Sequence, residues 1–62
     1  MNMYEIKAWY KLETFGGLFF TACIIQETDS HIKFDTKRNE QLVWAKSDIK
    51  RATLLERNEG EQ

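Results

Sequence analysis

The chain has 62 residues, of which 42% are apolar, 13% aromatic and 31% charged, and it contains no proline. This length allows one domain, and a domain so short buries only about 60% of the surface of its unfolded chain. Its one cysteine, Cys23, excludes an intrachain disulfide, and one histidine, His31, leaves too few ligands for a common zinc site. Association of several copies is therefore the expected source of further stability.

The chain shows no apolar run long enough to span a membrane and no secretory signal at its start. With a single cysteine, these features favour a cytoplasmic protein without a membrane partner. Nine basic and ten acidic residues give a net charge of −1. A strong nonspecific nucleic-acid binder would show a clear basic excess. We expect residues 1–55 to form the domain and the glutamate-rich residues 56–62 to form a flexible acidic tail.

The first half of the chain predicts two strands joined by a glycine turn. Residues Tyr4–Glu13 alternate, which predicts a long strand with one buried side. Trp9 lies on its charged side, either as a shielded surface aromatic or as a contact with a partner. Residues Thr14–Gly17 end in two glycines and predict a hairpin turn rather than a phosphate-binding loop. Residues Leu18–Glu27 are apolar at successive positions and predict a strand buried on both faces, in which Cys23 is buried and unreactive.

The second half predicts three shorter strands. In chain order we expect a polar turn (Thr28–Ser30), an alternating strand (His31–Thr36) and a charged turn (Lys37–Glu40). A short strand (Gln41–Ala45), a tight connection (Lys46–Asp48) and a last strand (Ile49–Leu55) follow. A helix over residues 47–56 is the alternative, but it has a poor cap and only about ten residues. Five short strands indicate an all-β fold, a small antiparallel barrel or sandwich.

This order of elements resembles the Sm-like family (Lsm and Hfq-type proteins) over about residues 6–55. The first family motif is similar at Gly17, Cys23, Ile25 and Asp29–Phe34, and the second at Leu42–Ile49. The resemblance implies a strongly bent five-stranded antiparallel barrel, a plan that SH3-like domains share, with little or no N-terminal helix. It also implies a homo-oligomeric ring of roughly five to seven subunits.

In Sm-like rings the turns between strands two and three and between strands four and five line a central pore that holds single-stranded RNA. The resemblance places His31 at the base-stacking position, Lys33 at the base-reading position and Lys46 in a basic pair. Asp29 and Ser30 belong to the same predicted RNA-binding turn. A flat imidazole can stack on an unpaired base, and a cation can contact phosphate. Lys33 stands where the family has asparagine, so it cannot make paired donor and acceptor contacts to a base.

Enzyme chemistry has little support in this sequence. His31 lies near Asp29 and Asp35, but a lone histidine near a turn is usually a surface residue. We expect neither catalysis, nor a cofactor, nor a metal.

Two other functions stay open. One is an SH3-like adaptor in which Trp9, Tyr10 and Trp44 form a peptide groove. The other is a structural ring whose RNA site is degenerate. The pair Lys37–Arg38 is either solvated or part of a second nucleic-acid face.

Overall fold

The structure, a computed structural model, describes residues 3–58, and in this range it contains five antiparallel strands and no α-helix. The strands are β1 (Trp9–Thr14), β2 (Phe19–Glu27), β3 (His31–Thr36), β4 (Gln41–Ala45) and β5 (Ile49–Glu56), with a 3-10 turn, η1 (Lys46–Asp48), between the last two. The predicted all-β class is confirmed, and so are β3 and β4 at both ends. The alternative helix over residues 47–56 is replaced by η1 and β5. Residues 59–62 of the predicted acidic tail lie outside the described residues.

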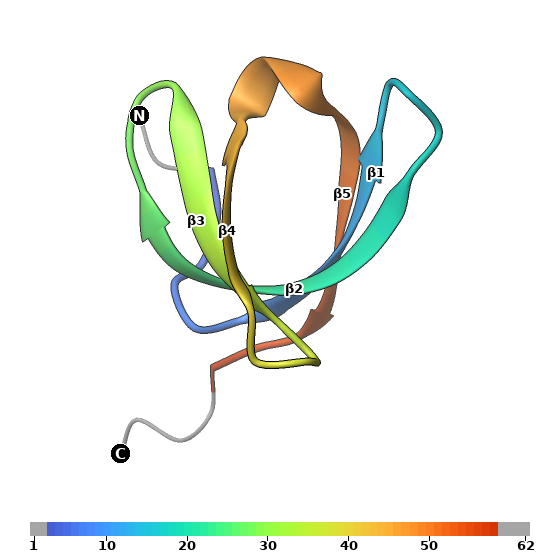
Figure 1. Cartoon of the computed structure of the whole chain (residues 1–62). Coiled ribbons are helices and arrows are strands. Elements are labelled where there is room, and N and C mark those ends of the chain that lie inside the picture. Colours follow the sequence, from blue (N-terminus) through green and yellow to red (C-terminus); the bar gives the residue numbers. More distant parts are fainter. Residues whose placement is uncertain (1–2, 59–62) are drawn as a thin grey trace.

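The strands form one sheet in the order β4-β3-β2-β1-β5 (Figure 1). The long strand β2 joins its two halves, because residues 19–23 pair with β1 and residues 22–27 pair with β3. The register of the second pairing shifts between Ile24 and Gln26. In Figure 1, β2 runs as an arc below β4 and β5, which η1 joins at the top. Strands β4 and β5 are therefore the two edges of the sheet.

The first strand begins later than its alternation predicts. The prediction of a strand from Tyr4 is wrong, because β1 starts only at Trp9. Lys7 has a φ of 66°, a left-handed conformation that turns the chain before the strand. The Tyr10 hydroxyl accepts a hydrogen bond from the Glu5 backbone N–H at 2.8 Å and holds this turn. Ile6, expected on the buried side, is 38% exposed.

The core lies on one face of the sheet. Its buried apolar residues among those described are Ala8, Tyr10, Leu12, Ala22, Ile24, Ile32 and Phe34. Strand β2 contributes Ala22 and Ile24 to it, whereas Phe19 on the same strand is 57% exposed. The prediction that this strand is buried on both faces is therefore wrong, because residues 3–58 form no second layer over the outer face of the sheet.

Cys23 lies on that outer face and is only half-buried, in contrast to the prediction of a buried thiol. Partial burial raises the pKa of the Cys23 thiol, and the negative charge of Asp35 raises it further. A raised pKa reduces the fraction of reactive thiolate at neutral pH. The expected low reactivity therefore rests on electrostatics as well as on partial burial.

The glycine turn between β1 and β2 gives the first testable prediction. Gly17 has a φ of +90°, and a Cβ built there meets nothing within 4 Å. Gly17→Ala should therefore lower the free energy of unfolding by about 1–2 kcal/mol through backbone strain alone. Urea unfolding at a fixed protein concentration measures this change.

Gly16→Ala is the matched control. Gly16 is not in the left-handed region, and its Cβ would lie 3.8 Å from the Thr14 hydroxyl, an ordinary contact. We expect this variant to be unchanged or stabilised by up to about 1 kcal/mol, because alanine restricts the unfolded chain. Equal destabilisation by both substitutions would contradict the assignment of strain to Gly17.

Candidate nucleic-acid interface

The two turns that the resemblance assigns to RNA binding lie side by side. The backbone N–H of Lys46 donates a hydrogen bond to the Ser30 carbonyl at 2.8 Å. His31 stands opposite Ala45 in the β3–β4 register. Figure 1 shows the β2–β3 turn and η1 at the same end of the sheet. Residues separated by about fifteen positions in the chain therefore meet at one end of the molecule, as expected from antiparallel pairing.

The β2–β3 turn is held by its own hydroxyl groups. Thr28 Oγ1 accepts hydrogen bonds from the backbone N–H of His31 at 3.0 Å and of Ser30 at 3.4 Å. The Ser30 hydroxyl lies 2.8 Å from His31 Nδ1, so it orients the imidazole ring. Asp29, Ser30 and His31 are all exposed. The predicted stacking residue therefore presents an oriented ring at the surface.

His31 and Lys33 share one shallow hollow of about 110 Å³. They occupy alternate positions of β3 and therefore lie on the same face of the sheet. The hollow is lined by Gln26, Thr28, His31, Ile32, Lys33 and Val43. Clefts that enclose small molecules measure roughly 300–1,000 Å³. This hollow suits contact with part of a polymer and not the enclosure of a free metabolite.

Lys46 has a different environment from His31 and Lys33. Its Nζ lies 2.6 Å from Glu27 Oε2, and the two side chains are only 13% and 1% exposed. The Glu27 carboxylate also accepts backbone hydrogen bonds from Met3 at 2.7 Å and from Tyr4 at 3.1 Å. The ion pair thus joins the N-terminal segment, the end of β2 and the start of η1. The sequence pattern predicts Glu27 only as the last residue of a strand and gives no sign that it pairs with Lys46.

The charge of Glu27 is stabilised by these contacts. Burial alone would raise the pKa of the Glu27 carboxyl, but the Lys46 ammonium 2.6 Å away and the backbone hydrogen bonds from Met3 and Tyr4 hold this pKa below its ordinary value of 4.5. The unfolded chain therefore binds the proton more readily than the folded one. The resulting stabilisation is complete above the ordinary carboxyl pKa and disappears as the pH falls through the lower pKa of the folded state.

The aromatic residues proposed for an adaptor groove lie apart. Tyr10 is buried in the core, and Trp44 packs edge-on against Phe20 with their ring centroids 5.2 Å apart. Trp9 points to the face opposite Tyr10. The Lys37 ammonium lies 4.2 Å from the centroid of the Trp9 ring and shields it. No single groove contains all three side chains.

Residues 3–58 contain no cluster of three or more histidine, cysteine, aspartate or glutamate side chains that could hold a metal ion. Within the same residues, the structure has no helix that could cross a membrane. Comparisons of the chain with protein-family models, with curated proteins and with solved structures found no match.

The buried ion pair gives the second prediction. Glu27→Gln should lower the free energy of unfolding by about 1–3 kcal/mol at neutral pH, because Lys46 loses its charged partner. The difference from the unmodified protein should shrink as the pH falls below about 4.5, where the carboxyl itself becomes protonated. Denaturant unfolding at a series of pH values measures both effects.

Glu56→Gln, at the exposed end of β5, is the control and should change stability by less than about 0.5 kcal/mol. A pH-independent loss in Glu27→Gln would mean that amide packing, and not the carboxylate charge, causes the effect.

Proposed function

We propose that this protein is an Sm-like domain that assembles with copies of itself and binds single-stranded RNA beside the β2–β3 turn. The observation that carries the proposal is the hollow shared by His31 and Lys33, one a flat exposed ring and the other a cation. The sequence resemblance supports the same location, since its RNA-binding turns are those that meet here.

In this proposal an unpaired base stacks on the His31 ring while the Lys33 ammonium contacts a phosphate. The Ser30 hydroxyl, 2.8 Å from the ring nitrogen, limits rotation of the imidazole and so reduces the entropy lost on stacking. Lys33 offers only donors and cannot pair with a base edge as an amide does. We therefore expect affinity for single strands with little base preference.

Lys46 acts indirectly in this proposal. Because its ammonium is bound to the buried Glu27 carboxylate, it positions the turn through its backbone contact with Ser30 and does not reach RNA itself. Asp29 and Ser30 shape the same turn. The RNA site therefore depends on fewer cations per subunit than the sequence resemblance alone implies.

The two edges of the sheet support the proposed assembly of several copies. Val43 on β4 is 62% exposed, and Leu54 and Leu55 on β5 are 36% and 53% exposed. Pairing of β4 in one copy with β5 of the next would satisfy backbone groups and bury these side chains. In Sm-like proteins, which this chain resembles, the fourth strand pairs with the fifth strand of a neighbouring subunit. Repetition of this contact closes a ring of roughly five to seven copies, and each ring then repeats the His31 hollow.

A structural ring with a degenerate RNA site is the second candidate. One observation favours it: Lys46, a predicted RNA-binding cation, forms an ion pair with Glu27 instead. The adaptor hypothesis has less support, since its aromatic residues do not share a surface.

RNA binding gives the third prediction. His31→Ala and Lys33→Ala should each weaken binding of a fluorescein-labelled oligouridylate by about tenfold. His31→Ala loses one stacked base, which costs roughly 1–3 kcal/mol, and Lys33→Ala loses one phosphate contact. Lys33→Ala should also reduce the dependence of affinity on salt, because one phosphate contact is lost. Fluorescence anisotropy between about 50 and 200 mM salt measures both changes.

Arg57→Ala is the matched control, because this exposed cation pairs with Glu5 at 2.8 Å and lies outside the hollow. It should leave the affinity unchanged. Equal affinity of all three variants, or no binding by the unmodified protein, would reject the RNA site and leave the structural ring.

A further inference from the structure

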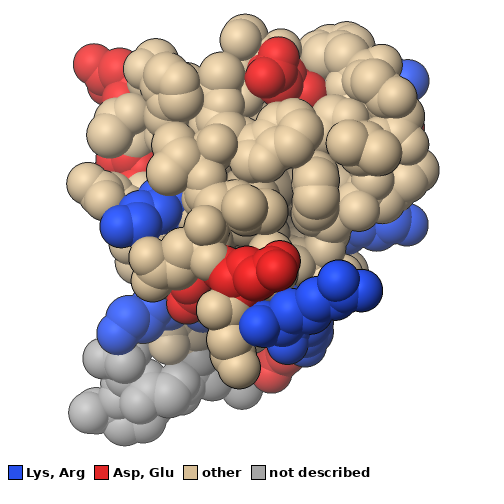
Figure 2. Space-filling model, viewed as in Figure 1, with Lys and Arg blue, Asp and Glu red and all other residues tan. Residues whose placement is uncertain are grey.

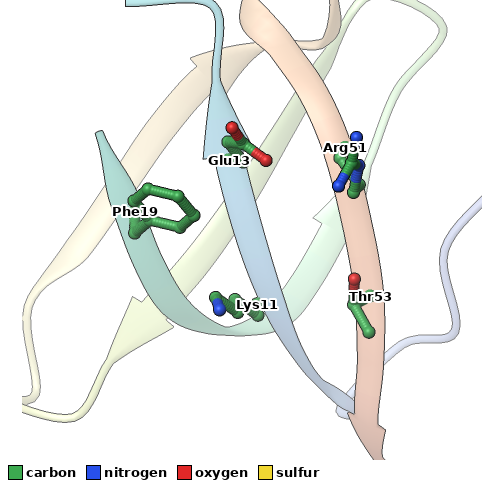
Figure 3. A pocket seen from close by; sticks show the side chains of 5 residues that line it. All are labelled: Lys11, Glu13, Phe19, Arg51 and Thr53. Carbon is green, nitrogen blue, oxygen red and sulfur yellow. The ribbon is translucent and has the colours of Figure 1, made fainter. Parts of the chain in front are cut away.

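Phe19, the first residue of β2, is a large aromatic side chain on the outer face of the sheet and is 57% exposed. It stands opposite Glu13 of β1, which in turn stands opposite Arg51 of β5. These side chains, with Lys11 and Thr53, line a hollow of about 320 Å³ across the three strands (Figure 3). The Lys11 ammonium lies 5.1 Å from the centroid of the Phe19 ring.

A second hollow of about 380 Å³ adjoins Phe19 on its other side. It forms because β2 leaves β3 at this point, since pairing with β3 begins only at Ala22. Its lining includes Phe19, Lys37 and Arg38, and is completed by Phe20, Thr21, Thr36, Glu40 and Leu42. Phe19 thus belongs to both hollows. We call the Phe19 ring and the four cations that line these hollows the Phe19 strip; the cations are Lys11, Lys37, Arg38 and Arg51.

The Phe19 strip is locally basic although the chain carries a net charge of −1. Four cations line the two hollows together with two carboxylates, Glu13 and Glu40. Glu13 is partly neutralised by Lys50, whose Nζ lies 3.9 Å from it. Figure 2 shows basic side chains over the turn between β3 and β4 with acidic side chains next to them, while most of the upper part of this face is uncharged. The strip therefore offers positive charge on both sides of an exposed ring.

We propose that the Phe19 strip is a binding surface for single-stranded nucleic acid, distinct from the His31 hollow. A base stacks on the part of the Phe19 ring that Lys11 leaves exposed, and the flanking phosphates contact the cations on each side. Charge complementarity selects a polyanion, and the aromatic ring, held on a strand, selects one that carries unpaired bases.

The two surfaces are separate along β2. Phe19 begins this strand, whereas His31 follows its end and the β2–β3 turn. The inference therefore does not depend on the proposed function, and the strip can bind nucleic acid even where the His31 hollow binds none.

The test uses anisotropy with the labelled oligouridylate and a matched pair of aromatic variants. Phe19→Leu should weaken binding by at least fivefold, because stacking is lost while an apolar side chain remains. Phe15→Leu is the control: Phe15 is 70% exposed in the neighbouring turn but lines neither hollow, so its affinity should not change. Both residues are exposed, and unchanged thermal unfolding of each variant confirms that the fold is intact.

An NMR titration of ¹⁵N-labelled His31→Ala protein with the same oligonucleotide separates the two sites. Shifts of the Lys11, Phe19 and Arg38 amides in this background support the strip. If the unmodified protein shows shifts only around His31, the strip is wrong and the proposed function stands. If shifts occur only around Phe19, the strip stands and the proposed function fails. Equal competition by an oligoglutamate peptide would also overturn the strip as a nucleic-acid site, because such a peptide has charge but no bases.

Discussion

One constraint shapes the part of the chain that the structure describes: the apolar core lies on one face of the five-stranded sheet, and the other face is only partly covered. Alternate side chains such as Leu12, Ile24 and Phe34 fill the core, and the others remain on the outer face or at the edges. A core of this size supplies little stability, since short domains bury a small share of their surface. The exposed Phe19 and Val43 are the direct result, and both proposals concern surfaces that this constraint leaves uncovered.

The Glu27 carboxylate compensates for part of this limitation. It binds the Lys46 ammonium and two N-terminal backbone N–H groups, and so it joins the N-terminal segment, the end of β2 and the start of η1. A buried carboxylate is costly unless it is paired and hydrogen-bonded, and here it is both. The same contact positions the turn that carries His31. Stability and the candidate RNA site are thus linked through one side chain, and loss of Glu27 would affect both.

Local patterns predict most of this fold and less of its surface chemistry. The bounds of β3 and β4 follow from their alternation and from the polar turns that flank them. The start of β1 does not, because alternation continues across the left-handed Lys7. The outward position of Phe19 and the Glu27–Lys46 pair depend on which strands are neighbours, and local sequence patterns do not specify that. The sequence places His31 and Lys33 two positions apart, and strand geometry then puts them on one face, so this part of the site was predictable.

In the proposed assembly, the edge strands β4 and β5 join copies of this chain. Light scattering of the tag-free protein at low and moderate salt gives its mass in solution. We expect one salt-stable species several times heavier than the 7.4 kDa chain, which Val43→Lys dissociates and Leu18→Lys, a change at an exposed turn residue, does not. A monomer of 7.4 kDa that stays soluble under these conditions would contradict it, because both edges would then be stable without a partner.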